Sequence, residues 1–513
     1  MLFTSYAFIG FLLILFVLYY VLPGKAKIVL LLIASYFFYL SAGPWGGIYI
    51  GVTTVTVYVF SLFIGNTLDS SKNLLSSPEG KALSKEEKKA KKDSAKKKAT
   101  LFMAFCIIIN IGILATVKTL GTMRADILVP LGISFYTLQS LSYLIDVKSG
   151  TEKAEKNILK VALFISFFPL TVQGPISRFS ELKDTLFVPH RFEWKNVSYG
   201  LTRILFGYFK KLVIADRLFK GVSTIIADTG TYSGGYAFLL LILYTAELYA
   251  DFTGGIDIAI GVAEVMGIKV PENFNCPYFS TSLKEYWRRW HITMCNWFKN
   301  YVFYPVSISK WMGKVKKFSG SHFGAYVGKR IPVYIASFIV WFLTGIWHGI
   351  GWNFITWGLL NFAILMISEE LEPLYDRFHN RFSFSNTFGY KVFMMIRTFI
   401  LICFLNLFDC FSNVGQTFSV MGSVFTGGKY GEVFSGGIFE IGLSRADFII
   451  AGIGLFVVFL VSVFKQKAPV RDRISALPMW CRCVLIGGLF VAIIVFGTYG
   501  IGYDASQFIY NRF

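Results

Sequence analysis

The stretch IPVYIASFIVWFLTGIWHGIGW, residues 331–352, decides the fold class of this chain. Its first 17 residues carry no charge, and a helix needs roughly 20 apolar residues to cross about 30 Å of hydrocarbon. A second apolar stretch, residues 354–367, follows almost at once. The pattern predicts two membrane-embedded helices with His348 between them. An ionisable side chain at membrane depth is costly unless it is used, so His348 is the first candidate for function.

Three glycines, Gly345, Gly349 and Gly351, surround His348. Because glycine has no side chain, another backbone or a ligand can come close at these positions. We interpret the pattern as a narrow cavity around a functional histidine. The alternative is a structural histidine bonded to a neighbouring helix.

The composition extends the membrane prediction to the whole chain. Of the 513 residues, 55% are hydrophobic and only 16% are charged, and the mean hydropathy is +0.57. These values lie outside the usual range of soluble globular proteins. Apolar runs recur along the chain and predict about eleven transmembrane helices, with shorter segments that are re-entrant or interfacial. We expect an all-α, multi-pass protein with one membrane domain over residues 1–513.

The net charge of +20 is divided among short basic clusters between apolar runs, as the positive-inside rule expects of cytoplasmic loops. This distribution argues against nucleic acid as a partner. Residues 71–98 are rich in lysine and predict a cytoplasmic hairpin or flexible loop. The seven cysteines lack metal-ligand spacing, so no metal site is predicted. The other clusters expected on the cytoplasmic face are residues 210–211, 288–289, 314–317, 329–330 and 465–473.

A second histidine lies in the sequence EYWRRWHIT, which begins at Glu285. Charges alternate there with tryptophans, as they do at a membrane surface, and Arg289 follows Glu285 at the favourable helical spacing. We expect one interfacial helix over residues 283–306, on which Arg288 and Arg289 bind the phosphates of a cytoplasmic donor and His291 lines its path. A membrane anchor without a catalytic role is the alternative.

Other polar groups in apolar sequence suggest further chemistry. His291 and Cys295 form a conceivable dyad in which the imidazole lowers the pKa of the thiol, although a cysteine in such a helix usually only packs. Asp251 and Asp257 need a partner or water. We expect them to hold a histidine or an arginine in place, or to cap a helix broken at residues 254–255. The absence of Walker, HExxH and GxSxG motifs argues against an ATPase, a zinc protease and a serine hydrolase.

Several motifs together resemble the membrane-bound O-acyltransferase family. The resemblance is to its bacterial branch of alginate O-acetylation proteins and, more distantly, to the teichoic acid D-alanyl transferases. The motifs follow one another in the same order over nearly the full length. They are PLGISFY (130–136), SYLIDV (142–147), GPI (174–176), FKKLVIADR (209–217), WRRWHIT (287–293) and GIWHG (345–349).

The resemblance implies that His348 is the active-site histidine and that His291 is the second motif position. It also implies a helical fold around a tunnel that joins a cytoplasmic donor to an acceptor on the other side. Residues 297–301 read WFKNY where the family usually has WFRDY, so a carboxylate is lost. The candidates for contact with substrate are Arg288, Arg289, Trp347, Asn353 and Asp251.

We therefore expect an O-acyltransferase of the bacterial plasma membrane. Its donor is expected to be acetyl-CoA, with no permanently bound cofactor, and its acceptor a hydroxyl of an envelope polysaccharide. The acetyl group is expected to reach the polysaccharide either directly or through a separate extracytoplasmic protein like the SGNH hydrolases, which is a plausible partner because the sequence predicts no catalytic domain outside the membrane. Transfer of D-alanine or another acyl group from an acyl carrier protein to teichoic acid is an alternative. Alternatives of other classes are a transporter or flippase for polymer precursors and a non-catalytic assembly subunit.

Overall fold

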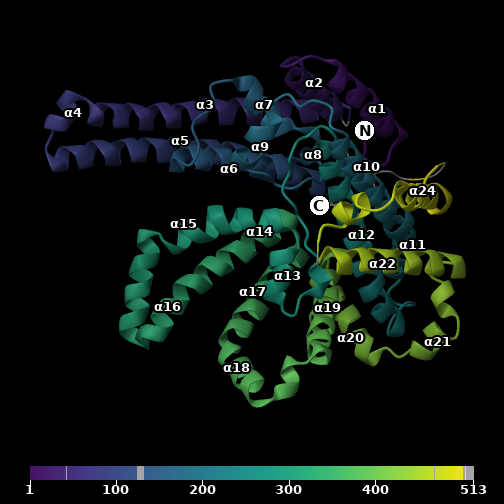
Figure 1. Cartoon of the computed structure of the whole chain (residues 1–513). Coiled ribbons are helices and arrows are strands. Elements are labelled where there is room, and N and C mark those ends of the chain that lie inside the picture. Colours follow the sequence, from purple (N-terminus) through teal and green to yellow (C-terminus); the bar gives the residue numbers. More distant parts are fainter. Residues whose placement is uncertain (42, 124–131, 467, 501–502, 504–513) are drawn as a thin grey trace. The chain divides into compact units, whose positions relative to one another are not determined.

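The computed structural model of this chain consists mainly of helices, many of them apolar, and describes all residues except 42, 124–131, 467, 501–502 and 504–513 (Figure 1). Over the described residues the backbone forms α-, 3-10 and π-helices and no strand, so the all-α prediction is confirmed. The chain divides into two compact units. The first comprises residues 1–201 and 259–271, and the second comprises residues 202–258 and 272–513.

Phenylalanine rings form a core at the start of the first unit. They join α1 (Tyr6–Val21), α2 (Ala26–Leu40) and α8 (Phe168–Thr171). The ring centroids of Phe8 and Phe38 are 5.7 Å apart, and those of Phe11 and Phe168 are 5.2 Å apart, both edge to face, which is a favoured aromatic geometry. The shorter helices of this unit are α6 (Ile133–Ser149), α7 (Ile158–Ser166) and α9 (Phe179–Leu186).

The lysine-rich segment of the first unit is an ordered helical hairpin. Figure 1 shows α3 (Pro44–Ser76) and α5 (Lys85–Met123) side by side, with α4 (Pro78–Ala82) at their far end. With 33 and 39 residues, the two long helices extend about 50 and 58 Å, well beyond the roughly 30 Å of a bilayer core. The polar ends of both helices therefore continue past their apolar parts. The cytoplasmic location of this hairpin remains a prediction.

The second unit is built around α12 (Gly235–Val265), whose last residues belong to the first unit. In the most apolar window of α12, 72% of the residues are buried in protein, compared with 17% for α22 (Arg445–Lys465) and 6% for α24 (Met479–Phe496). Apolar side chains exposed in this way are expected to face lipid, because water would disfavour them. The polar residues of α12 therefore lie inside the protein.

Two glycines let α10 (Trp194–Tyr208) approach α12 closely. A Cβ atom on Gly207 would lie 2.7 Å from the carbonyl oxygen of Gly254, so the backbones meet directly at this point. The predicted break at residues 254–255 is wrong, because α12 is continuous and Gly254 serves this close packing instead. The π-helix η1 (Phe209–Ala215) continues from α10.

Seven helices of the described chain are long and apolar enough to span a membrane. The number is eight if α17 (Trp352–Glu370) and α18 (Glu372–Arg381), bent by 50°, form one broken span. The shorter apolar helices α1 and α2 are additional to these. The number is lower than eleven partly because residues 158–170 form the short helices α7 and α8, most of whose residues are buried within protein. The seven are α3, α5, α12, α16 (Lys310–His348), α19 (Phe388–Cys410), α22 and α24.

Helix α16 turns back on itself at Gly324, where φ is +86°. This backbone conformation favours glycine because a Cβ atom would be strained. Next to the turn, a Cβ on Gly328 would lie 2.6 Å from the Cα of Gly320, so the two arms touch. The second arm ends at His348 and packs along α17. Other helices of this unit are α11 (Asp216–Ala227), α15 (Tyr304–Ser307), α20 (Val414–Thr426), α21 (Tyr430–Phe434) and α23 (Val470–Ser475).

Candidate active site

His291 interrupts the helix that the sequence predicts over residues 283–306. Its φ of +46° and ψ of +49° are left-handed, which is uncommon and costly for a residue other than glycine. The single-helix prediction is therefore wrong: α13 (Leu283–Arg289) ends before His291, α14 (Ile292–Phe298) starts after it, and the π-helix η3 (Lys299–Phe303) follows. Such backbone strain persists where the surroundings hold it, often at functional sites.

The His291 side chain is completely buried among aromatic rings. The ring of Phe252, on α12, meets it edge to face at 5.0 Å between centroids. The ring of Trp347, on α16, lies at 6.1 Å in a similar orientation. Burial lowers the pKa of His291 well below its ordinary value, and the nearby His348 contributes to the same effect. His291 is therefore neutral near pH 7.

His348 stands between two tryptophans at the end of α16. Its ring is 5.0 Å from that of Trp347 and 4.9 Å from that of Trp357 on α17, both edge to face. Unlike His291, it is only half-buried as a residue, although its Nε2 atom is buried. The structure thus brings the two histidines together in one aromatic cluster, which consists of Phe252, His291, Trp347, His348 and Trp357.

The position of His348 against Trp357 depends on close packing of α16 on α17. A Cβ on Gly345 would lie 2.7 Å from the carbonyl oxygen of Phe354, and one on Gly358 would lie 2.4 Å from that of Trp341. Each of the two helices thus has a glycine at the point where their backbones touch. This contact gives Gly345 of the GIWHG motif a packing role.

Replacing Gly358 with valine should push α17 away from α16 and displace Trp357 from His348. Misplacement of a catalytic group by 1 Å can cost about 10²-fold in rate, so we expect the acyl transfer that the sequence resemblance implies to slow by about that factor. The rate is to be measured on purified protein in liposomes. Gly313→Val is the matched control, because that glycine of α16 is exposed and has no neighbour within 4 Å of an added Cβ. Equal rates for the two variants would contradict the role of the glycine contact.

The other site candidates lie in different surroundings. Arg289 forms the predicted ion pair with Glu285, at 2.7 Å, and is partly exposed. Arg288 is exposed and has no ion pair within the described residues, so its guanidinium remains available for a ligand. The buried amide of Asn353 donates to the carbonyl oxygen of Phe408 at 2.8 Å, a contact between helices.

Asp251 is buried in an ion cluster with Lys211. Lys211 Nζ also lies 2.7 Å from Asp216 Oδ1, and Tyr503 donates to the other oxygen of Asp216 at 2.8 Å. Neither Lys211 nor Asp251 has exposed area. Asp251 thus has the role expected of an acidic residue in apolar sequence, except that its cation is a lysine rather than a histidine or an arginine.

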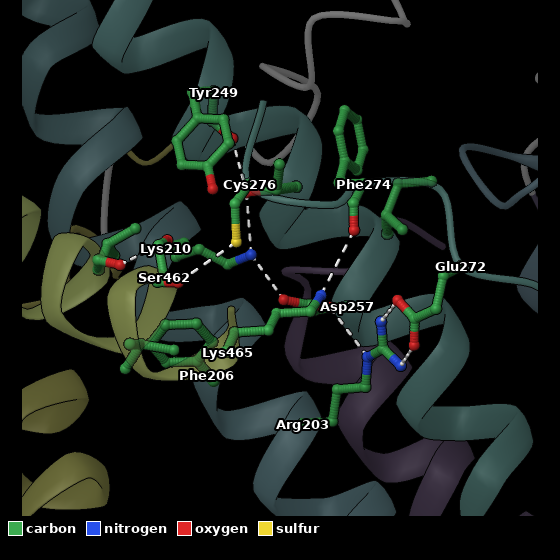
Figure 2. A pocket seen from close by; sticks show the side chains of 14 residues that line it. Arg203, Phe206, Lys210, Tyr249, Asp257, Glu272, Phe274, Cys276, Ser462 and Lys465 are labelled. Atoms are coloured by element: carbon green, nitrogen blue, oxygen red, sulfur yellow. Dashed lines mark hydrogen bonds and ion pairs between the residues drawn. The ribbon is translucent and has the colours of Figure 1, made fainter. Parts of the chain in front are cut away.

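A second ion cluster, in which the two cations are buried and Glu272 is half exposed, joins α10, η1 and α12 (Figure 2). The guanidinium of Arg203 binds Asp257 at 2.8 Å and both oxygens of Glu272 at 2.6 and 2.7 Å. Lys210 donates to Asp257 at 2.6 Å and to Thr253 at 2.9 Å. Burial raises the pKa of the Glu272 carboxyl, but Arg203 outweighs this effect and holds it below its ordinary value. A cavity of about 60 Å³ adjoins the cluster, with Tyr249, Phe274, Cys276, Ser462 and Lys465 among its other lining residues.

The sequence prediction did not foresee the burial of the two lysines of these clusters. Residues 210–211 were expected on the cytoplasmic face, but both side chains are buried and paired with carboxylates of α12. The sequence contained a signal for this pairing, since Asp251 and Asp257 also lie in apolar sequence and need cations. The positive-inside rule alone could not distinguish a buried lysine from an exposed one.

Cys295 does not have the properties of a catalytic thiol. Burial raises its pKa to about 12, so the thiolate that a dyad with His291 requires is disfavoured. Its Sγ donates to the carbonyl oxygen of Trp290 at 3.7 Å. Packing, the alternative considered from the sequence, fits this position better.

Comparison with known proteins gives a consistent picture. The model of the membrane-bound O-acyltransferase family matches residues 155–410, which include both histidines. The chain is 32% identical to the probable alginate O-acetylase of Azotobacter vinelandii over 385 residues, covering 72% of this chain and 69% of the relative. It is 31% identical to the peptidoglycan O-acetyltransferase of Helicobacter pylori over 279 residues, 49% of this chain and 50% of the relative.

A third relative has another activity. The teichoic acid D-alanyltransferase of Bacillus subtilis is 30% identical over 280 residues, covering 53% of this chain and 67% of the relative. All three relatives are named for transfer of an acyl group. Together with the apolar helices, these matches show that the chain is a multi-pass membrane enzyme of the membrane-bound O-acyltransferase family.

Proposed function

We propose that this enzyme transfers an acetyl group from cytoplasmic acetyl-CoA to a hydroxyl of an envelope polysaccharide. The observation that carries the proposal is the meeting of His291 and His348 in one aromatic cluster. Imidazole is a suitable base for activating a hydroxyl near neutral pH. The aromatic walls exclude water, which would otherwise hydrolyse a thioester.

In the proposed reaction, His348 is the general base. It takes the proton of the acceptor hydroxyl while the hydroxyl oxygen attacks the carbonyl carbon of the thioester. The carbon–sulfur bond then breaks, and the imidazolium returns the proton to the sulfur of CoA. No oxidant or further reactant is needed. A passage through the protein would lead the donor to this point from the cytoplasmic side. His291 would line it beside His348 and share with His348 the role of proton acceptor.

Arg288 is the proposed contact for the phosphates of the donor, because it is exposed and has no ion pair among the described residues. Arg288→Gln should raise the KM for acetyl-CoA about tenfold with little change in kcat, since one charge-assisted hydrogen bond contributes about 1.5–3 kcal/mol. Steady-state kinetics at low and high salt would measure this. Arg289→Gln is the control on the same helix, because Arg289 is already paired with Glu285. An unchanged KM for Arg288→Gln would assign the phosphates to other residues.

The names of the relatives support a polysaccharide as the acceptor. Two are named for alginate and peptidoglycan, and both activities are O-acetylations. The acetyl group would pass to the polymer either directly or through an extracytoplasmic protein like the SGNH hydrolases. Measuring the O-acetyl content of envelope polymers in a deletion strain would identify the acceptor. Loss of the polymer itself would instead indicate an assembly subunit.

Purified protein in liposomes tests the reaction class. With acetyl-CoA and a hydroxyl acceptor, we expect release of free CoA together with acetylation of the acceptor. A transporter or flippase would move its substrate without releasing CoA. The relative named for D-alanyl transfer to teichoic acid supports a second candidate function. That function would require a D-alanyl carrier protein as donor, and acetyl-CoA would then give no turnover.

A further inference from the structure

The backbone on both sides of His291 is held by the segment of residues 272–276. The backbone N–H of Ile292 donates to the backbone carbonyl oxygen of Asn273 at 2.9 Å. The backbone N–H of Asn275 donates to the carbonyl oxygen of Arg289, also at 2.9 Å. The two hydrogen bonds place this segment alongside the break between α13 and α14. They explain how the left-handed backbone of His291 is maintained.

The side chain of Asn273 contacts His291 from this segment. It is fully buried, and its Oδ1 accepts the backbone N–H of Thr293 at 3.0 Å and the Thr293 hydroxyl at 2.8 Å. A backbone N–H can only donate, so the amide atom that faces it must be the oxygen. The third neighbour of the same oxygen is Nδ1 of His291, at 3.3 Å. An oxygen can only accept, so Nδ1 must carry the hydrogen.

We infer that Asn273 is a positioning residue that fixes the Nδ1–H tautomer of His291 and leaves Nε2 as its basic nitrogen. A neutral imidazole carries one N–H, so the nitrogen opposite the bonded one has the lone pair. The inference rests on the proposed function, because it gives His291 a proton-accepting atom for acyl transfer. Partners that fix an imidazole in this way usually matter nearly as much as the imidazole itself.

The surroundings of His291 keep that imidazole in the required neutral form. Three side chains that contact it, Phe252 of α12, Trp347 of α16 and Asn273, carry no charge. The titratable group that acts on it is His348, which disfavours a second positive charge nearby. One proton on the ring, held on Nδ1, is therefore the expected state.

The ion cluster of Figure 2 holds Asn273 from its two neighbours in sequence. Glu272 binds Arg203 through both oxygens, and Lys465 at the end of α22 donates to the carbonyl oxygen of Phe274 at 3.3 Å. The segment is thus fixed between α10 and α22 at the residues on either side of Asn273. This support preorganises the amide before any substrate arrives.

Two substitutions of Asn273 test the inference. Asn273→Ala removes the acceptor, and kcat should fall about 100-fold with little change in the KM for acetyl-CoA. Asn273→Asp keeps an oxygen for the same three donors but adds negative charge beside the ring. That charge favours the imidazolium, so the acid limb of the kcat/KM–pH profile should move upward by about one unit or more, with activity restored at high pH.

The controls separate this inference from the proposed function. Asn275→Ala and Asn275→Asp change an exposed asparagine of the same segment and should leave both kcat and the pH profile unchanged. If the wild type and the controls transfer acetyl groups while Asn273→Ala keeps a normal kcat, or Asn273→Asp keeps a wild-type pH profile, the inference is overturned. If Asn273→Ala does not fold, the pH profile of Asn273→Asp decides alone. If the wild type transfers no acetyl group at all, the proposed function fails first.

Discussion

Replacing His348 with alanine should lower the rate of acetyl transfer by about 10²–10⁴-fold, the usual contribution of a general base. The imidazole lies between Trp347 and Trp357 and is the proposed acceptor of the hydroxyl proton. Alanine cannot take that proton, and the hydroxyl would then attack the thioester without activation. The measurement is the release of CoA from acetyl-CoA by purified protein in liposomes, together with the acetyl content of the acceptor.

A matched variant separates catalysis from folding in this experiment. His322 lies in the first arm of the same helix, α16, and is exposed, so His322→Ala should retain the wild-type rate. Both variants should unfold in detergent at temperatures close to that of the wild type. A near-normal rate for His348→Ala would remove His348 from the mechanism and leave His291 as the remaining candidate base.

Replacing Lys211 with methionine should destabilise the fold by about 3–5 kcal/mol, which is typical when one partner of a buried ion pair is removed. Lys211 is fully buried and contacts both Asp251 and Asp216. Methionine has a similar length but leaves two carboxylates close together without their cation. We expect a clearly lower unfolding temperature in detergent, measured by the loss of helical circular dichroism.

The second half of this test uses an exposed ion pair and a compensating change. Lys284→Met breaks a pair with Glu369 in which the side chains are 51% and 37% exposed, and it should cost only about 0–1 kcal/mol. The double variant Lys211→Met with Asp251→Asn should recover part of the loss, because it leaves one buried carboxylate instead of two. A Lys211→Met protein as stable as Lys284→Met would show that the buried cluster does not stabilise the fold.

The predictability of the site from sequence differs from residue to residue. His291 and His348 stand out locally, because one lies among charges and tryptophans and the other lies among glycines at membrane depth. Asn273 gives no such signal. It lies two residues from Asn275 in the sequence NFN, and only the fold buries one and exposes the other. The sequence therefore predicted the histidines but not the residue that orients one of them.

The sequence by itself determined the all-α membrane class and singled out the two histidines as candidates for the site. The length of an apolar run and the cost of an ionisable group within it are local properties, so they can be evaluated without a fold. Tertiary structure decided the break at His291, the burial of residues 210–211 and the meeting of His291 with His348. Each of these depends on partners far away in the chain, such as Asn273 for the break and Asp251 for Lys211, and periodicity and charge counts contain no information about such partners.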